Sequence, residues 1–272
     1  MIEVRGVSHD YAAQGGNITA VRDVDLSLTA GELLVLLGAN GSGKSTLARI
    51  IAGLLVPTAG EVLVDGLSTR DIATAWDIRR LVGVVFQNPD NQIVGTVVEE
   101  DVAFGPENLG LPREEIRRRV DLALEAVGLT GFERREPHLL SGGQKQRLAM
   151  AGALAMNPTY LVLDEPTAML DRGGRADVLE VLEALRSAGH GILHVTHHLA
   201  DAAKADRVAV MDEGSLAFCG SPAELMAMAD RFSSLGLGLP PVAVLAKHLR
   251  EGGLTVPALA MDPESVVQAL WR

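Results

Sequence analysis

Three short apolar runs without alternation stand out along the chain. They are Glu32–Leu37 (ELLVLL), Tyr160–Asp164 (YLVLD) and Ile192–Thr196 (ILHVT). A run of this kind is typical of a strand that is buried on both faces of a parallel sheet. A helical pattern follows the first run, from Thr46 to Ile51. This alternation of buried strands and helices predicts an α/β fold.

The middle of the chain has a different pattern. From Glu114 to Val127 apolar residues return at helical spacing until Gly128, and a second regular run extends from Gln144 to Met156. We therefore expect one domain over residues 1–218. Its α/β core comprises residues 1–87 and 156–218, and residues 88–155 form a mainly helical subdomain.

Residues 219–272 are predicted to form a C-terminal helical extension. SPAELM starts a helix with Ser221 as N-cap and Pro222 in the first helical position, and two further helices are expected over 242–250 and 263–270. Their apolar side chains are expected to pack on the core or on the same segment of a second chain, which would make the extension a dimerisation element. These residues are Val244, Leu245, Leu249, Val266, Val267 and Leu270.

A glycine-rich loop follows the first strand. Gly38–Ser45 reads GANGSGKS and connects the predicted strand to the predicted helix. The free backbone N–H groups of such a loop and the positive end of the helix dipole favour a phosphate group. In this pattern Lys44 reaches the outer phosphates and the Ser45 hydroxyl is a ligand for Mg²⁺. The loop predicts nucleotide binding, and by itself it leaves kinases, GTPases and helicases open.

Two acidic residues end the second strand. Asp164 at the strand tip is suited to hold magnesium through water, and Glu165 is suited to act on an attacking water as a general base. An isolated Asp-Glu pair would equally fit a solvated strand end. A further polar segment, Ser141–Gly143, precedes the helix that begins at Gln144, and its N–H groups predict a second anion site.

The order of these motifs resembles that of the nucleotide-binding subunits of ABC transporters, over roughly residues 1–218. The matching segments are VVFQ ending at Gln87, LSGGQKQR at Leu140–Arg147, the acidic strand end, Leu170–Asp171, and HVTHH with His197; Tyr11 matches an aromatic residue that stacks on adenine. The resemblance implies a P-loop NTPase core that binds ATP and Mg²⁺.

The resemblance also implies a role for each matching residue. Glu165, His197 and Lys44 are the implied catalytic residues, and Ser45, Gln87 and Asp164 are the implied magnesium ligands. The implied nucleotide-binding residues are Tyr11, Gly38, Asn40, Gly41, Ser42, Gly43, Lys44, Ser45, Thr46, Gln87, Ser141, Gly142, Gly143, Gln144 and Asp171.

The family also implies that the two anion sites of one chain lie on different lobes and face apart. Two chains packed head to tail would bring the glycine-rich loop of each against the LSGGQ segment of the other. Every motif is intact in this chain, which favours a homodimer; a paralogous ATPase is the alternative partner.

Residues 86–112 indicate a subgroup within this family. FQNPDNQ from Phe86 to Gln92 and the VEEDVAFGPENLGLP that follows at residues 98–112 are similar to ATPases of energy-coupling-factor importers, and the chain as a whole most resembles the cobalt or nickel uptake ATPase. This implies integral-membrane subunits as partners, a peripheral place on the cytoplasmic face of the membrane, and cobalt or another transition metal as cargo, with a vitamin as the alternative. Acidic residues of this segment become candidate acceptors for basic groups of a membrane subunit: Glu99, Glu100, Asp101 and Glu107.

The composition of the chain argues against several other classes of protein. The net charge of -11 argues against nucleic acid as a partner, and the single Cys219 excludes an internal disulfide and fits a reducing compartment. No stretch approaches the roughly 18 apolar residues that would span a bilayer. A soluble ABC ATPase that acts on DNA or ribosomes remains the alternative to a transporter subunit, although such proteins usually carry a long coiled coil or tandem cassettes. The chain contains no N-K-x-D segment, which argues against a GTPase.

Overall fold

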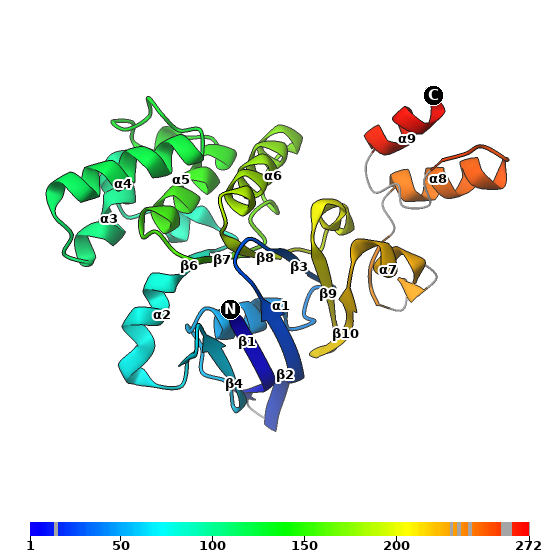
Figure 1. Ribbon diagram of the computed structural model, residues 1–272, viewed down its shortest axis with the longest axis horizontal. Helices are drawn as coiled ribbons and strands as arrows, with labels where there is room; N and C mark the ends of the chain where they lie inside the picture. The colour runs from blue at the N-terminus through cyan, green and yellow to red at the C-terminus, as the bar shows by residue number, and fades with distance from the viewer. Residues whose placement is uncertain (14–15, 229–230, 233–234, 239–240, 257–262, 272) are drawn as a thin grey trace.

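The fold is described from a computed structural model. It covers residues 1–13, 16–228, 231–232, 235–238, 241–256 and 263–271. A six-stranded sheet in the order β10-β9-β3-β8-β7-β6 forms the centre of the molecule (Figure 1). Its strands are β3 (Leu33–Gly38), β6 (Val82–Val85), β7 (Tyr160–Asp164), β8 (Gly191–Val195), β9 (Arg207–Asp212) and β10 (Ser215–Gly220).

The three strands predicted from apolar runs lie side by side in this sheet. β3, β7 and β8 are adjacent and parallel, and every residue in them is buried. Only β10 runs antiparallel, at the edge. The α/β fold predicted from these runs is confirmed. Because parallel strands end at the same edge, the residues that follow β3, β7 and β8 come together there.

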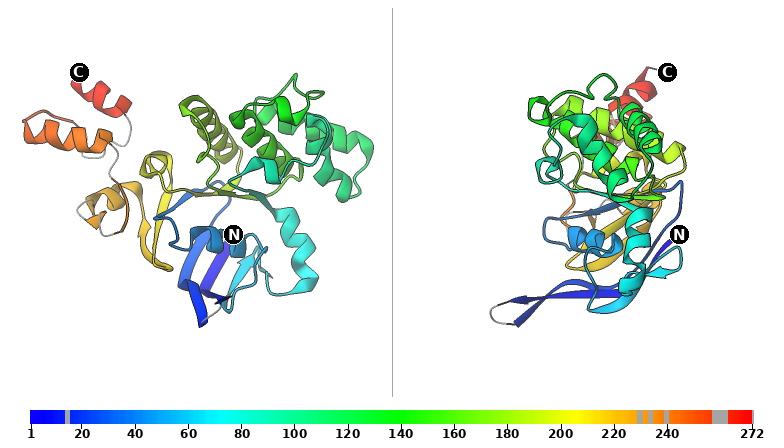
Figure 2. Two further views of the ribbon diagram at one scale, coloured as in Figure 1. Left: turned by 180° about the vertical axis from the view of Figure 1, so that it is seen from behind. Right: turned by 90° about the vertical axis from the view of Figure 1, so that its left-hand side faces the viewer.

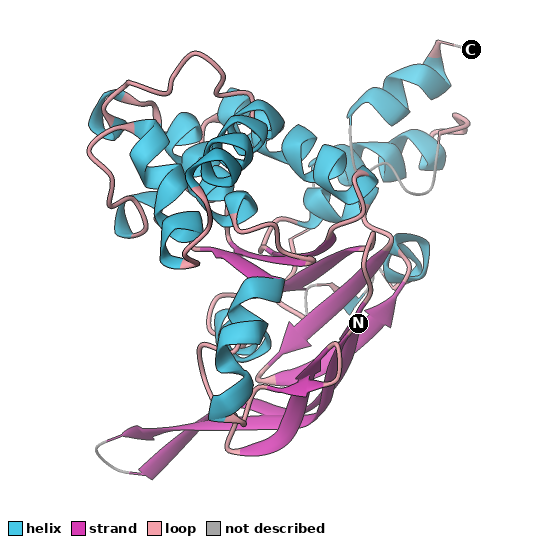
Figure 3. Ribbon diagram, turned by 60° about the vertical axis from the view of Figure 1, so that its left-hand side comes forward, coloured by secondary structure: helices cyan, strands magenta, loops and turns pink. Residues whose placement is uncertain are grey.

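A second sheet lies below the first one and is antiparallel, in the order β2-β1-β4-β5 (Figure 3). Its strands are β1 (Ile2–Ala13), β2 (Gly16–Leu28), β4 (Ala59–Val64) and β5 (Leu67–Ser68). The long hairpin of β1 and β2 projects from the body (Figure 2). Helix α1 (Lys44–Ile51) packs between the two sheets through Leu47 and Ile50, which are fully buried.

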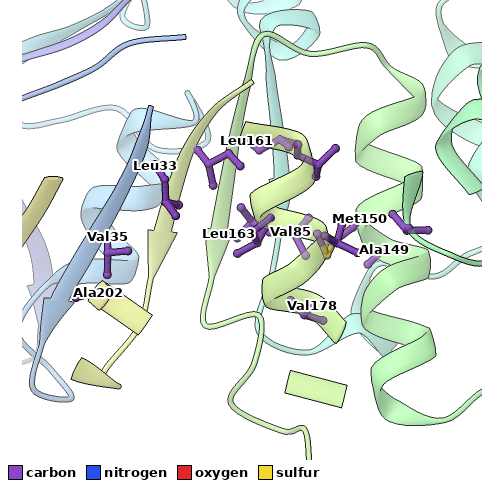
Figure 4. Packing of buried hydrophobic residues seen from close by; sticks show 14 of the residues in the cluster. Leu33, Val35, Val85, Ala149, Met150, Leu161, Leu163, Val178 and Ala202 are labelled. Carbon is purple, nitrogen blue, oxygen red and sulfur yellow. The ribbon is translucent and has the colours of Figure 1, made fainter. Parts of the chain in front are cut away.

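Helices cover the opposite face of the central sheet. They are α3 (Val98–Asn108), α4 (Arg113–Ala126), α5 (Gly142–Ala155) and α6 (Arg172–Ser187). Figure 4 shows how Met150 of α5 and Val178 of α6 meet Leu161 and Leu163 of β7 in one buried cluster. Helices α3 to α5 form a lobe at one end of the sheet, within the range expected to be helical (Figure 1).

Short helices complete the connections between these elements. They are η1 (Ile72–Thr74), α2 (Ala75–Leu81), η2 (Pro89–Asn91), η3 (Pro137–Leu139) and η4 (Leu199–Lys204).

The C-terminal extension consists of α7 (Pro222–Ala227), α8 (Pro241–Glu251) and α9 (Pro263–Leu270), at the opposite end of the sheet from the α3–α5 lobe (Figure 1). Ser221 is the N-cap of α7 and Pro222 its first residue, as the sequence indicated, and the structure adds a capping box with Glu224. Leu225 and Phe232 are buried in the main core.

Helices α8 and α9 depart from the expectation of packing on the core, except for Ala243 of α8, which belongs to the main core. Ala246, Val256 and Val266 form a small cluster of their own with Leu249 against it. The remaining apolar positions are exposed: Val244, Leu245, Val267 and Leu270. The alternative that these four side chains pack on the core is therefore wrong. Helical spacing shows which residues share a face, but not what covers that face.

Candidate active site

The glycine-rich loop connects the end of β3 to the start of α1. A Cβ on Gly38 would lie 2.4 Å from Met211 O, and one on Gly43 would lie 2.2 Å from Ala20 O. Both glycines have positive φ angles, 153° and 97°. Only glycine meets both conditions. The loop is thus held close to neighbouring backbone, and its shape is fixed by the sequence.

Lys44 lies in the first turn of α1, and its side chain is folded into the loop. Its Nζ donates hydrogen bonds to Gly38 O and Ala39 O, each at 2.8 Å. Burial lowers the pKa of Lys44, while Glu165 and Asp164 oppose that shift. The ammonium is therefore a buried donor beside the two acidic residues of β7, on a side chain long enough to exchange carbonyl partners for phosphate oxygens.

Ser45 and Asp164 are joined directly. Ser45 Oγ donates to Asp164 Oδ1 at 2.8 Å. Burial raises the pKa of Asp164, although the hydrogen bond from Ser45 and the nearby Arg49 and Lys44 counteract it. A hydroxyl and a carboxylate are hard oxygen ligands of the kind that Mg²⁺ prefers, and a bound cation would offset the cost of the buried charge. The residues present therefore fit a magnesium ion.

Glu165 and His197 form the next contact. His197 Nδ1 lies 3.0 Å from Glu165 Oε1 and 2.9 Å from Oε2. The Glu165 side chain is 9% exposed and that of His197 is 40% exposed. The backbone of Glu165 has a φ of 52°, which is costly for a residue with a side chain, and its N–H is tied to Val195 O. This strained, doubly anchored geometry aims a carboxylate past the tip of β7.

His198 lies beside His197, with ring centroids 4.0 Å apart. Sequence alone could not decide which of the two histidines points to Glu165. In the structure His197 contacts the carboxylate and His198 stacks on its ring.

Tyr11 lies on β1 next to the start of α1. Its hydroxyl is 3.3 Å from Thr46 Oγ1, and His9 packs edge-on against its ring at 4.7 Å between centroids. The Tyr11 residue is 39% exposed. It therefore offers an aromatic face at the rim of the phosphate loop, where a purine base can stack.

Gln87 is exposed on the loop after β6, and its neighbours hold that loop in place. Gln92 accepts from Phe86 N at 2.7 Å, and Gln146 Nε2 donates to Phe86 O at 3.3 Å. Lys145 Nζ donates to Asp90 Oδ1 at 2.7 Å. Sequence reasoning missed these three supports, because no local pattern relates the loop to α5. The contacts of Gln146 and Lys145 connect the loop of Gln87 to α5, the helix that begins after Ser141.

Ser141 caps α5, and its hydrogen bonds are local. Its Oγ accepts from Gln144 N at 3.3 Å, while Gln144 Oε1 accepts from Ser141 N at 3.0 Å. Ser141 and Gln144 thus form a capping box, and the S-x-x-Q pattern of the sequence is the local signal for it. Ser141, Gly142, Gly143 and Gln144 line a cleft of about 520 Å³ together with Asp171, the N-cap of α6.

Apart from Gln87, which is exposed on the loop after β6, the predicted side chains fall into two groups. Tyr11, Lys44, Ser45, Asp164, Glu165 and His197 gather around the ends of β3, β7 and β8. Ser141–Gln144 and Asp171 line the separate cleft. Within the part of the chain that the structure describes, no residue of Gly38–Thr46 lines that cleft.

The expectation that Asp101 receives a basic group from a membrane subunit is wrong. Asp101 is 8% exposed, and its Oδ1 accepts from the N–H groups of Val94 and Gly95 at 2.7 and 2.9 Å. It closes an internal turn before α3. Glu99 is paired with Arg117 at 2.9 Å, and Glu100 accepts from Thr96 Oγ1, so these two acids are also partly engaged within the chain.

This geometry defines a P-loop ATPase, and comparison with known proteins gives its family. A family model described as ABC transporter matches residues 21–168. EcfA1, an energy-coupling factor transporter ATP-binding protein of Symbiobacterium thermophilum, is 54% identical over 99% of this chain and 96% of that protein. CbiO, a cobalt import ATP-binding protein of Syntrophus aciditrophicus, is 46% identical over 100% of this chain and 97% of that protein. The chain belongs to the ABC transporter family, among the ATP-binding ATPases of energy-coupling-factor transporters.

Solved structures agree with this family. The structure of cbiO1 from Clostridium perfringens, part of the ABC transporter complex cbiONQ, has a TM-score of 0.77 at 36% identity and covers 92% of this chain and 98% of that one. The dimeric structure of MJ0796, a bacterial ABC transporter cassette, has a TM-score of 0.74 at 33% identity and covers 81% of this chain and 98% of that one. In the described ranges, the helices are all too short or too polar to cross a membrane.

Proposed function

We propose that this chain is the Mg²⁺-dependent ATP-hydrolysing subunit of an energy-coupling-factor importer for cobalt or another transition-metal ion. The contact between His197 Nδ1 and Glu165 carries the hydrolytic part of the proposal, because it holds a carboxylate near Lys44 of the phosphate loop. The similarity to the cobalt import ATP-binding protein CbiO supports the cargo. Catalysis of phosphoryl transfer depends on this kind of placement and charge stabilisation.

The roles of the residues follow from their positions. Tyr11 stacks on adenine, and Lys44 exchanges its bonds to Gly38 O and Ala39 O for phosphate oxygens. The N–H groups of the loop, from Asn40 to Thr46, bind the remaining phosphate oxygens. Glu165, oriented by His197, accepts the proton of the attacking water.

Ser45, Asp164 and Gln87 would hold Mg²⁺. When bound, the ion supplies charge neutralisation at the phosphate oxygens. Ser45 and Asp164 are already hydrogen-bonded to each other, and Gln87 would reach the site from a loop that is attached to α5 through Gln146.

We propose that two copies assemble head to tail. Ser141 and Gly143 belong to the LSGGQ segment, here called the signature, and they line the signature cleft, which is separate from the phosphate loop. The signature of one chain would therefore complete the site of its partner. Asp171 at the rim of that cleft would lie at the same interface. The dimeric form of the MJ0796 cassette supports this assembly. A paralogous ATPase could occupy the second position.

The surface that best fits a membrane subunit is a cleft of about 230 Å³ between α3, α5 and β6. Gly105 and Gly152 are among the residues that line it, and Phe104, which also lines it, is 53% exposed. Val94, at 63% exposure, adds a second apolar group. An apolar helix of an integral-membrane partner would cover these side chains, which holds the chain peripherally at the cytoplasmic face.

The exposed apolar side chains of the C-terminal extension support a role for it in dimerisation. Residues 1–218 contain both site groups, whereas α8 and α9 leave Leu245, Val267 and Leu270 exposed. A second copy of the extension would cover this apolar surface. Changing Leu245 and Val267 together to Asp should then weaken dimerisation in light scattering; an unchanged dimer would show that the extension has another role.

The cargo is tested in cells together with the partners. Tagged protein extracted in mild detergent should copurify integral-membrane subunits, and radioactive cobalt uptake should fall on deletion and stay low with Glu165→Gln. Uptake of a vitamin in place of metal would leave the proposed ATPase role intact and change the cargo. Copurification of soluble or ribosomal partners alone would contradict the transporter role.

A further inference from the structure

A buried ion pair lies between η4 and α6, behind the proposed catalytic contact. The Asp201 side chain is 1% exposed. Its Oδ1 accepts from Arg175 Nη2 at 2.6 Å, and its Oδ2 accepts from Thr196 Oγ1 at 3.0 Å. Both carboxylate oxygens are therefore satisfied, one by a residue of α6 and one by the residue that precedes His197.

His194 is the third titratable group in this cluster. Its Nε2 is 3.8 Å from Asp201 Oδ2, too far for a hydrogen bond, and within the described chain neither ring nitrogen has a hydrogen-bond partner. Burial lowers the pKa of His194. A neutral ring does not compete with Arg175 for the carboxylate.

Asp201 fixes the backbone on both sides of His197. Thr196 Oγ1, which donates to Asp201, accepts from His198 N at 3.1 Å, and the N–H of Asp201 donates to His198 O at 3.1 Å. Thr196 N is anchored to Leu36 O in the central sheet at 3.0 Å. The residue before His197 and the one after it are thus both tied to Asp201.

Arg175 connects the same carboxylate to the signature cleft. It lies in the first turn of α6, and its N–H donates to Asp171 O at 3.0 Å. Asp171 Oδ1 accepts from Gly174 N at 2.9 Å, and a Cβ on Gly143 would lie 3.1 Å from Gly174 Cα. The start of α6 therefore packs against the start of α5, at the cleft that Asp171 and Ser141 line.

Stability alone gives little reason for this pair. Desolvation of the buried Asp201 carboxylate and of the partly buried Arg175 guanidinium offsets much of their attraction, and apolar residues of similar volume serve a core as well or better. The ion pair instead fixes an orientation. The charge-assisted hydrogen bond from Arg175 orients Asp201 relative to α6, and the hydrogen bond from Thr196 orients it relative to the segment of His197. The chain of contacts runs from Asp171 through Arg175 and Asp201 to the two neighbours of His197.

We propose that Asp201 and Arg175 are positioning residues that hold His197 against Glu165 and make that contact depend on the position of the start of α6. This inference rests on the proposed roles of Glu165 and His197. A partner that binds in the signature cleft would change the position of the first turn of α6. Because Arg175 lies in that turn and pairs with Asp201, the segment that carries His197 would change its position as well. Neither residue needs to touch nucleotide.

The test compares four single variants of the full-length protein. Asp201→Asn keeps the shape and removes the charge; Arg175→Met keeps the apolar stem, and because Arg175 is 24% exposed this variant is the safer one for folding. Arg186→Met is the matched control, since Arg186 lies in the last turn of the same helix and pairs with Glu183 and Asp206. Arg175→Lys tests rescue by a retained charge.

Two readouts are measured: the KM and kcat of Mg²⁺-ATP hydrolysis, and the ring nitrogen resonances of His197, assigned by their loss in His197→Ala. We expect kcat to fall about 10- to 100-fold in Asp201→Asn and Arg175→Met, the size of a small misplacement of a catalytic group, with KM for ATP changed less than about twofold. The His197 resonances should move in both variants and stay in place in Arg186→Met. The double variant that combines Asp201→Asn with Arg175→Met should have a kcat no lower than that of Asp201→Asn alone. Arg175→Lys should have a higher kcat than Arg175→Met.

Other results overturn the inference. It is wrong if kcat in both variants equals that of Arg186→Met, if the two substitutions act additively, or if the His197 resonances do not move. Failure of the proposed function looks different: the wild type would then hydrolyse Mg²⁺-ATP no faster than Glu165→Gln, and movement of the His197 resonances would still decide whether Asp201 positions that ring.

Discussion

Ser45 Oγ donates a hydrogen bond to Asp164 Oδ1 across 2.8 Å, which joins the first turn of α1 to the last residue of β7. The two residues are 119 positions apart in sequence. They meet because β3 and β7 are parallel strands on either side of β8 and end at the same edge of the sheet. The magnesium site we propose is therefore a consequence of strand order.

The buried charge at this site predicts a cost in stability. Burial raises the pKa of Asp164 above the ordinary aspartate value of 3.8, so its ionised form is less favourable in the folded than in the unfolded chain. Stability is then lost as the pH rises through the raised pKa. Asp164→Asn should increase the melting temperature at pH 7 without Mg²⁺ by about 2 °C, as about 1 kcal/mol would at this chain length. Thermal unfolding followed by circular dichroism measures this.

The same experiment has an internal control. The difference between wild type and Asp164→Asn should vanish below about pH 4, where both side chains are neutral. Addition of Mg²⁺ with ATP should stabilise the wild type more than the variant. A variant that is less stable than the wild type at pH 7 would contradict the burial argument.

Several parts of this arrangement could be predicted from the sequence. The buried parallel strands could be predicted because β3, β7 and β8 are apolar at every position or nearly so. An apolar run without alternation indicates that both faces of a strand are buried. The glycine-rich loop was readable because Gly38 and Gly43 meet a local backbone requirement. Each of these signals is contained in a segment of a few residues.

What could not be predicted depends on contacts between distant segments. The Arg175–Asp201 pair and the Lys145–Asp90 pair each join two elements, and no local pattern marks either partner. Asp101 was expected to be a surface acid, yet the turn at Val94 and Gly95 brings two N–H groups to it. Charge in a sequence reports neither exposure nor the donors that a folded loop supplies.

Lys44 is expected to control ATP affinity. Its buried Nζ already makes two hydrogen bonds to loop carbonyls, so the donor is oriented before phosphate arrives. Lys44→Met should weaken ATP binding about 10- to 100-fold, the effect of losing charge-assisted hydrogen bonds of about 1.5 to 3 kcal/mol. Calorimetric titration measures the affinity. Lys204→Met serves as the control, since Lys204 is an exposed residue at the end of η4, and equal affinities in the two variants would remove Lys44 from this role.

Glu165→Gln should separate binding from hydrolysis. An amide can still accept a hydrogen bond from His197 but cannot take a proton from water, so kcat should fall about 100-fold or more while ATP affinity changes less than about twofold. A phosphate-release assay and calorimetry give the two quantities. Glu180→Gln, on the exposed face of α6, should behave as wild type. Normal turnover in Glu165→Gln would mean that another group activates the water.

Phe104 is expected to contribute to membrane docking. It is 53% exposed at the cleft between α3, α5 and β6, where a charge would have to be desolvated on binding. Phe104→Asp should abolish copurification of membrane subunits and leave ATP hydrolysis of the isolated chain unchanged. Leu122→Asp on α4, where Leu122 is 51% exposed, is the control. Equal copurification in both variants would place the docking surface elsewhere.

Mixing two inactive variants tests whether the signature acts on the partner chain. Ser141→Arg blocks the signature cleft, and Lys44→Met disables the phosphate loop, so each homodimer should be inactive. A mixed dimer contains one site with an intact Lys44 from one chain and an intact Ser141 from the other, because the two groups belong to separate surfaces. Mixing should restore up to about a quarter of wild-type turnover, since about half of the dimers are mixed and each has one intact site. A single chain carrying both substitutions, mixed with the wild type, controls for subunit exchange. If Ser141 acted on the nucleotide of its own chain, every site in the first mixture would lack one of the two groups and no activity would return.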